Sequence, residues 1–246
     1  MRSSRAIPLV LALLAVGVTA TAIALPAGGG GPTRPSRPAA AAPRTAGPPP
    51  APERTAPGPP PARRPVTSPE RIRWRRSVAV GDPAAGRLLR GVRLPSSGEH
   101  FFTWDPVKRR SPNRYWRRWG TDRLVRLLLR VAREYHTAHP GAPRMAIGDL
   151  SRPGGGDFGP QFGYIGHATH QNGLDADVYY PRADGLERAP RYASQINRRL
   201  SQELVDRFVA AGAVIVYVGP NTGLRGPPGV VQAIVNHDNH LHVRIR

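Results

Sequence analysis

The chain has 246 residues and a formal charge of +20, because 36 lysines and arginines stand against 16 aspartates and glutamates. Its 29 prolines and 27 glycines are unevenly distributed, which indicates that part of the chain is not folded core. The absence of cysteine excludes a disulfide framework, a thiolate nucleophile and a cysteine-ligated metal, and leaves histidine and carboxylate side chains as metal ligands. The charge predicts an anionic partner, and composition alone leaves open nucleic acid, a membrane surface or an acidic polymer.

Residues 1–25 have the pattern of an export signal. Arg2 and Arg5 precede an apolar run, residues 6–25, whose end is rich in small residues that suit a cleavage site. The run is also about as long as a minimal membrane span of roughly 20 residues, so an uncleaved membrane anchor is the alternative. Both interpretations place the rest of the chain beyond the cytoplasmic membrane, in a secreted, cell-wall or periplasm-like location. They argue against nucleic acid as the natural partner.

Residues 26–70 are rich in proline, alanine, glycine, threonine and arginine and have almost no large apolar side chain. Such a segment buries too little surface to offset the entropy lost on ordering, which predicts a disordered, partly polyproline-II spacer. The first 70 residues carry +6 of the formal charge, which leaves +14 on residues 71–246. The predicted folded part is therefore itself basic.

Residues 71–246 have the length of a single domain. A helix with an apolar stripe is predicted after Thr121, which is a good N-cap, and Pro140 ends it. A second helix is predicted from apolar residues spaced by four that begin at Ile196, with Gly212 as its stop. Strands are predicted at residues 144–147, 175–179, 214–218 and 240–245. The predicted fold class is α+β, with a small, mostly antiparallel sheet and flanking helices.

Five of the eight histidines fall in two short clusters, residues 166–177 and 237–242, each together with carboxylates. Histidine is largely neutral at pH 7, so a solubility role does not explain them. His240 and His242 project from the same face of the last predicted strand, because they alternate with apolar residues. A catalytic zinc ion needs three protein ligands and one open position. The candidates for these ligands are His170, Asp177 and one histidine of the last strand.

Three motifs give this part of the chain a family resemblance. They are His167-x-x-His170-x-x-Gly173-x-x-x-Asp177, Gly148-Asp149-Leu150-Ser151 and His237-x-x-His240-x-His242-Val243-Arg244. In this order and spacing they resemble the penicillin-insensitive murein endopeptidase family, zinc peptidases related to lysostaphin-type and D-Ala-D-Ala peptidases. The resemblance extends over about residues 92–246. It implies a zinc-peptidase-like catalytic domain with Zn²⁺ as cofactor and peptidoglycan as substrate, untouched by β-lactams because it has no serine nucleophile.

The resemblance also implies roles for individual residues. The family's metal ligands fall on His170, Asp177 and His242. His240 matches the first histidine of the family's His-x-His pair, which would act beside the attacking water as a base or as a stabiliser of the oxyanion. His237 is implied as a second catalytic histidine, and His167 as a further residue of the active site or its substrate contacts.

Four residues near the candidate ligands in the sequence have two possible roles each. Asp175 shares a strand face with Asp177, which favours a carboxylate that orients a ligand histidine over a turn residue at the strand end. Asp149 and Ser151 either border the substrate cleft or belong to an ordinary turn after a strand. Arg244 either binds a substrate carboxylate through two hydrogen bonds or pairs with an acidic neighbour.

The leading hypothesis is a zinc-dependent peptidoglycan endopeptidase that cuts between D-alanine and a diamino acid in cross-linked stem peptides. One alternative is a D,D-carboxypeptidase or dipeptidase on the same scaffold. A second is a wall-binding module that holds zinc structurally and does not catalyse. A third, an extracellular binder of nucleic acid, would need neither His170 nor Asp177.

Overall fold

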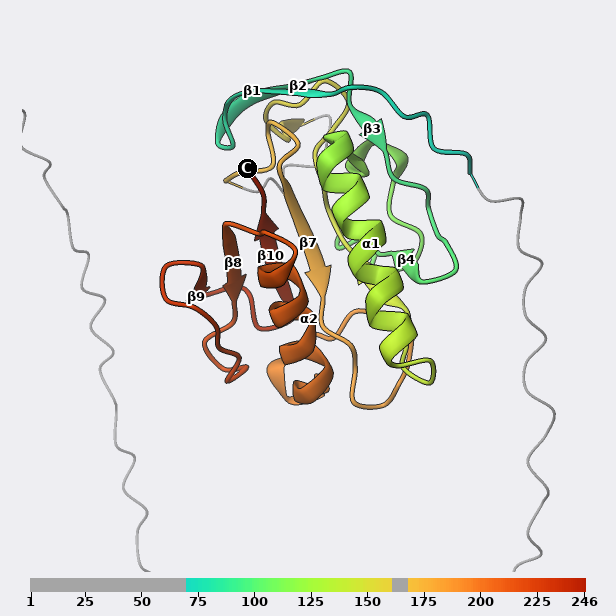
Figure 1. Ribbon diagram of the computed structural model, residues 1–246, viewed down its shortest axis with the longest axis vertical. Coiled ribbons are helices and arrows are strands. Elements are labelled where there is room, and N and C mark those ends of the chain that lie inside the picture. The colour runs from blue at the N-terminus through green and yellow to red at the C-terminus, as the bar shows by residue number, and fades with distance from the viewer. Residues whose placement is uncertain (1–69, 161–167) are drawn as a thin grey trace, which may run out of the picture. The chain divides into compact units, whose positions relative to one another are not determined.

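The computed structural model describes residues 70–160 and 168–246, which are the coloured part of Figure 1. They belong to one unit of the chain, which begins at Pro61. The predicted signal or anchor and the spacer lie outside the described residues, apart from Glu70, so both stay predictions, as does the domain boundary at residue 71. No helix within the described ranges is long and apolar enough to cross a bilayer.

The centre of the domain is a six-stranded sheet with the order β4-β6-β7-β10-β8-β9. Its strands are β4 (Phe101–Thr103), β6 (Met145–Ile147), β7 (Asp175–Tyr179), β8 (Ile215–Val218), β9 (Val231–Ala233) and β10 (His240–Arg244). The inner pairings of β6 with β7, β7 with β10 and β10 with β8 are antiparallel, whereas β4 and β9 join the two edges in parallel. The prediction of a small, mostly antiparallel sheet is confirmed, and the four predicted strands correspond to β6, β7, β8 and β10.

Two helices lie on one face of this sheet (Figure 1). Helix α1 (Asp122–Ala138) begins where the Thr121 hydroxyl accepts a hydrogen bond from the backbone N–H of Leu124 at 3.2 Å, as predicted. Helix α2 (Arg198–Ala210) begins after Ile196, where the apolar spacing starts. Its N-cap is Asn197, whose side chain accepts a hydrogen bond from the backbone N–H of Leu200. Ile196 therefore precedes the helix, although its side chain is still buried in the core.

Alternation along β7 and β10 separates the two faces of the sheet. The core residues of these strands are fully buried among the apolar side chains of the helices; they are Ala176, Val178, Leu241 and Val243. Successive side chains of a strand point to opposite faces. The intervening residues, which project from the face away from the core, are Asp175, Asp177, Tyr179, His240, His242 and Arg244.

Shorter elements that the sequence did not predict surround the sheet. They are the hairpin β1 (Val78–Asp82) and β2 (Ala85–Leu89), the pair β3 (Val92–Arg93) and β5 (Trp119–Gly120), and the 3-10 helices η1 (Tyr115–Arg117) and η3 (Ala193–Gln195). Gly155 contacts both β2 and the loop that carries His170. A Cβ at Gly155 would lie 2.2 Å from the carbonyl oxygen of Gln171, so this close approach of two backbones requires glycine.

Candidate active site

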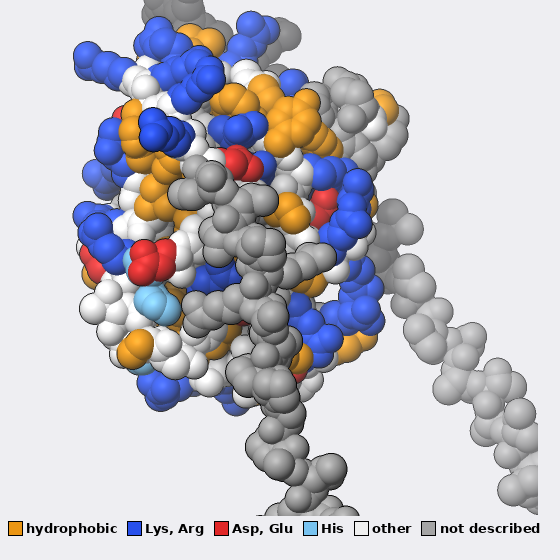
Figure 2. Space-filling model, turned by 90° about the vertical axis from the view of Figure 1, so that its right-hand side faces the viewer, with side chains coloured by type: hydrophobic (Ala, Val, Ile, Leu, Met, Phe, Trp, Pro, Cys, Tyr) orange, Lys and Arg blue, Asp and Glu red, His pale blue; other side chains and the backbone are white. Residues whose placement is uncertain are grey.

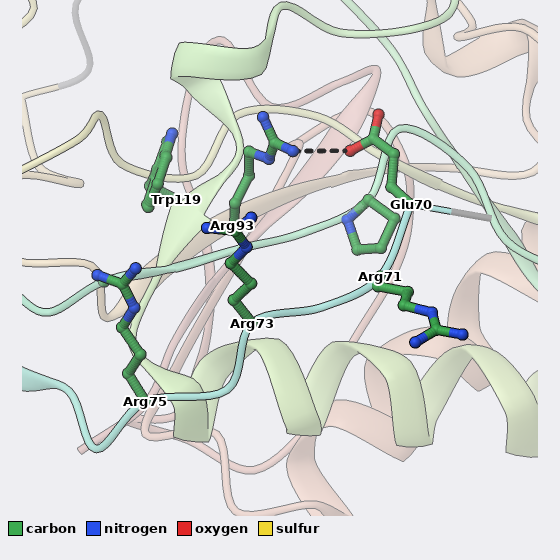
Figure 3. A pocket seen from close by; sticks show the side chains of 8 residues that line it. Glu70, Arg71, Arg73, Arg75, Arg93 and Trp119 are labelled. Carbon is green, nitrogen blue, oxygen red and sulfur yellow. Dashed lines mark ion pairs between the residues drawn. The ribbon is translucent and has the colours of Figure 1, made fainter. Parts of the chain in front are cut away.

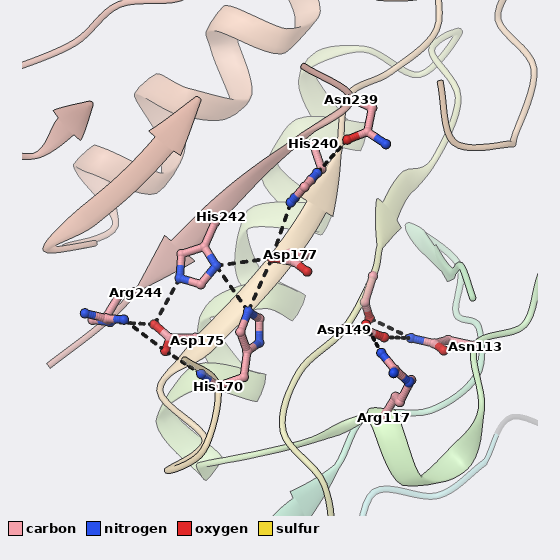
Figure 4. Close-up of polar contacts among 11 residues, drawn as sticks. Asn113, Arg117, Asp149, His170, Asp175, Asp177, Asn239, His240, His242 and Arg244 are labelled. Atoms are coloured by element: carbon pink, nitrogen blue, oxygen red, sulfur yellow. Dashed lines mark hydrogen bonds and ion pairs between the residues drawn. The ribbon is translucent and has the colours of Figure 1, made fainter. Parts of the chain in front are cut away.

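Three side-chain atoms converge on the face of the sheet away from the helices (Figure 4). His170 Nε2 lies 3.1 Å from His242 Nδ1 and 3.4 Å from Asp177 Oδ1, and the latter two atoms are 3.2 Å apart. All three residues are buried. A tetrahedral ion whose ligand bonds measure about 2.0–2.2 Å requires ligand atoms roughly 3.3–3.6 Å apart. The donor types fit a zinc ion, and the three spacings of 3.1–3.4 Å lie within about 0.2 Å of this range.

The register of the sheet sets two of these three residues side by side, since His242 in β10 is the direct partner of Asp177 in β7. His170 comes from the loop before β7. Its φ of +73° lies in the left-handed region, which costs energy for a residue other than glycine. A hydrogen bond of 3.0 Å from the His170 backbone N–H to Asp175 Oδ2 holds this conformation. Strain at His170 is thus balanced by a contact from the strand that carries Asp177.

Asp175 supports the cluster from β7. Its Oδ1 lies 3.3 Å from His242 Nε2, the ring nitrogen that does not face His170, and accepts a hydrogen bond from Arg244 Nε at 2.6 Å. Burial raises the pKa of Asp175, but hydrogen bonds from His242 and Arg244 and the nearby histidine charges outweigh it and hold that pKa well below its usual range. This geometry agrees with the interpretation of Asp175 as a carboxylate that orients a histidine. The contact with Asp175 also agrees with the second interpretation of Arg244, in which this arginine pairs with an acidic neighbour.

Metal binding at this cluster is expected to strengthen as pH rises. Burial lowers the pKa of His242, but hydrogen bonds and charges from Asp175 and Asp177 outweigh burial and raise the pKa to about 9. Below that pH a metal must displace the His242 proton. We expect the zinc affinity of the metal-free protein to rise about tenfold per pH unit between pH 6.5 and 8.5, with about one proton released per ion. Calorimetry in buffers of different ionisation enthalpy measures both quantities. An affinity independent of pH over this interval would contradict the assignment of His242 as a ligand.

Two further histidines lie beside the cluster. His240 Nε2 is 3.7 Å from Asp177 Oδ1, and His240 Nδ1 is 2.7 Å from Asn239 Oδ1 (Figure 4). An amide oxygen accepts, so Nδ1 carries the hydrogen of this bond, and in the neutral ring Nε2, on the side of Asp177, is then the acceptor. The His237 ring lies 4.9 Å from that of His240 and 6.2 Å from that of His242. His167, in contrast, lies outside the described residues.

Asp149 and Ser151 are both fully buried. Asp149 forms an ion pair with Arg117 and accepts a hydrogen bond of 2.9 Å from Asn113 Nδ2 (Figure 4). The backbone carbonyl of Asp149 accepts from the N–H of Asp177 at 2.9 Å, and Ser151 pairs with Trp119 backbone to backbone. The motif thus runs through a buried ladder of backbone and side-chain contacts, and a role of Asp149 and Ser151 at the substrate cleft stays a prediction. Its effect on the site is to hold the strand that carries Asp177.

The buried pair makes Arg117 a large contributor to stability. Removing one partner of a buried ion pair leaves an uncompensated charge, which costs about 3–5 kcal/mol. We expect Arg117→Ala to lower the free energy of unfolding by about that amount, as measured by urea denaturation. The control is Arg188→Ala, whose ion pair with Asp184 is exposed and is expected to contribute less than about 1 kcal/mol. Equal losses in the two variants would refute this account of Arg117.

An open groove of about 830 Å³ adjoins the histidine cluster. Tyr179, the partner of His240 in the sheet, and Asn239, which binds His240, both line it. Trp104 and Tyr192 add aromatic surface, and arginines make up half of the remaining lining. The groove thus reaches the residues that contact His240.

A buried His–Asp–His cluster at the edge of an open groove in an α+β domain is typical of metal-dependent hydrolases. Residues 79–212, more than half of the chain, match the family described as penicillin-insensitive murein endopeptidase. The chain belongs to this family. The match begins and ends earlier in the chain than the predicted range of about residues 92–246. Strands β8 and β10 therefore lie outside the match. His240 and His242 lie beside Asp177 because β10 pairs with β7.

Two curated relatives carry the same name. The penicillin-insensitive murein endopeptidase of Haemophilus influenzae is 32% identical over 192 residues, which are 68% of this chain and 62% of the relative. That of Escherichia coli O157:H7 is 30% identical over 129 residues, 52% of this chain and 40% of the relative. The chain thus spans less than two thirds of the length of either relative.

Sequence reasoning missed Asn113, Arg117 and Asn239. Asn113 and Arg117 lie 36 and 32 residues before Asp149 in the chain, and no local pattern connects them with it. Asn239 directly precedes His240 in the sequence. An amide next to a candidate base could have been predicted to orient its imidazole ring.

Proposed function

We propose that this protein is a zinc-dependent peptidoglycan endopeptidase that hydrolyses the bond between D-alanine and a diamino acid in cross-linked stem peptides. The observation that carries the proposal is the convergence of His170, Asp177 and His242, with donor atoms 3.1–3.4 Å apart, in a chain of the murein endopeptidase family. The names of the relatives support murein as the substrate. In this proposal His170 Nε2, Asp177 Oδ1 and His242 Nδ1 hold the metal.

Zinc in that position supplies Lewis acidity, which polarises a carbonyl and makes water nucleophilic near neutral pH. The chain's own residues then handle the proton. His240, with Nδ1 bonded to Asn239, presents Nε2 as the base that takes the proton of the attacking water and passes it to the leaving amine. His237, in ring contact with His240, is the second candidate for this transfer. Asp175 fixes the ring of His242 through Nε2.

The charge of the domain supports an acidic polymer as substrate. Residues 71–246 carry +14, and blue lysine and arginine side chains predominate over red acidic ones on the face in Figure 2. Arg109 and Arg191 line the groove beside the cluster, and neither side chain has an ion pair or hydrogen bond among the described residues. Free guanidinium groups bind carboxylates such as those of stem peptides. Export beyond the cytoplasmic membrane, which residues 1–25 predict, would bring the domain to this substrate.

Mass spectrometry of digested peptidoglycan tests the proposal. We expect cross-linked dimers to disappear and monomers with intact D-alanine termini to accumulate, with activity lost to a chelator and restored by zinc. Release of free alanine without loss of dimers would overturn the endopeptidase in favour of a carboxypeptidase. Zinc bound in stoichiometric amount with no product at all would favour the wall-binding module.

A further inference from the structure

A second pocket lies apart from the histidine cluster and shares none of its residues. It has a volume of about 220 Å³ and lies between the segment at residues 70–75 and the β3–β5 ladder (Figure 3). Its lining is dominated by arginine, with one acidic residue and one aromatic residue; the charged and aromatic members are Glu70, Arg71, Arg73, Arg75, Arg93 and Trp119. The whole of this segment precedes residue 79, where the family match begins, so half of the pocket's lining comes from outside the matched region.

The arginines of this pocket are mostly uncompensated. Glu70 pairs with Arg93 at 3.5 Å and with Arg118 at 3.3 Å, so its charge is already shared between two guanidinium groups. Arg71, Arg73 and Arg75 have no ion pair and no side-chain hydrogen bond among residues 70–160 and 168–246, and all three are exposed. Like charges held together without a counter-ion repel one another, so the pocket is set up for an anion from outside the domain.

The spacing of these arginines indicates a linear ligand. Ile72 packs against the core and Trp74 lies under the guanidinium of Arg126 at 4.0 Å, whereas the alternate residues Arg71, Arg73 and Arg75 line the pocket. Alternate residues of an extended chain recur roughly every 6.6 Å. Figure 3 shows Arg73, Arg75 and Arg93 on the side of the segment where Trp119 lies. One guanidinium group is enough to bind a single carboxylate, whereas a row of guanidinium groups matches anionic groups that repeat along a polymer.

We propose that this arginine pocket binds a linear phosphodiester polymer without bases and anchors the protein to it. Guanidinium groups match the geometry of phosphate oxygens bidentately. Sites for single-stranded nucleic acid add several aromatic side chains on which bases stack, and here Trp119 is the one aromatic residue in the lining. The anchor is separate from the proposed hydrolytic site, and it would hold that site near such a polymer.

The probe for this proposal is poly(glycerol phosphate) of defined length, labelled for fluorescence anisotropy with the full-length protein. We expect the triple variant Arg71→Gln/Arg73→Gln/Arg75→Gln to bind at least tenfold more weakly than the wild type. The matched control, Arg133→Gln/Arg198→Gln/Arg225→Gln, removes the same charge from exposed positions outside the pocket and is expected to lose less than threefold. The single variant Arg75→Glu, expected to lose about as much as the pocket triple, guards against effects of the three changes on folding.

Equal losses in the two triple variants would overturn the pocket as a site and leave only attraction to net charge. Tighter binding of oligothymidylate than of poly(glycerol phosphate) would overturn the polymer without bases in favour of nucleic acid. His242→Ala is expected to bind poly(glycerol phosphate) like the wild type, so a failure of the proposed hydrolysis and a failure of the anchor remain distinguishable.

Discussion

Replacing His242 by alanine is expected to abolish both zinc binding and the hydrolysis of cross-linked peptidoglycan. The residue provides one of three donor atoms that lie 3.1–3.4 Å apart in a buried site. Loss of a residue that merely orients a metal ligand costs about 10–100-fold in metal affinity or activity. Loss of the ligand itself should exceed that range, because two donors remain and a buried gap replaces the imidazole. Metal analysis of the purified variant and muropeptide analysis measure the two effects.

The same result is expected for His170→Ala and Asp177→Ala. His136→Ala, a change at a half-buried histidine of α1 whose ring packs against His100, is the matched control and should retain both metal and activity. A ligand variant that keeps stoichiometric zinc would show that its side chain is not in the metal site. If all three variants lose zinc yet still cleave dimers, the metal is structural and the proposed mechanism fails.

Replacing His240 by alanine is expected to leave the metal in place and to lower turnover by about 10²–10⁴-fold, the range for removal of a general base. The His240 imidazole lies beside the cluster and is fixed by Asn239, and its Nε2 is 3.7 Å from Asp177 Oδ1. It can therefore transfer protons without contributing to the three-donor set. The measurement is the turnover number of the zinc-loaded variant, together with its metal content.

His237→Ala is the informative comparison for His240, because the two rings are neighbours and either could accept the proton. We expect the smaller loss at His237, since its Nδ1 lies 2.9 Å from the carbonyl oxygen of Val235, whereas His240 Nε2 lies 3.7 Å from Asp177 Oδ1 in the three-donor cluster. An unchanged turnover number in His240→Ala together with a large loss in His237→Ala would show that His237, and not His240, is the base. Zinc loss in His240→Ala would instead place His240 among the ligands.

The sequence by itself determined the local structure of the two helices and of the strands that carry the site. Thr121 caps a helix and Pro140 follows its end, because capping and helix termination depend on side chains within a few residues. Alternating residues in β7 and β10 placed Asp175 with Asp177 and His240 with His242 on common faces, since the strand period is two. The residue types also restricted the metal chemistry, because a chain without cysteine leaves histidine and carboxylate oxygen as ligands.

Only the tertiary structure decided which of these residues meet. His170 and His242 are 72 residues apart in the chain, and the register of β7 against β10 and the left-handed turn at His170 bring their nitrogens to 3.1 Å. The buried pair of Arg117 and Asp149 likewise depends on long-range packing. Periodicity and capping reflect interactions between near neighbours, whereas strand register and buried charge pairs are fixed when the whole core forms. The sequence could therefore supply the candidates for the site, and the fold selected their partners.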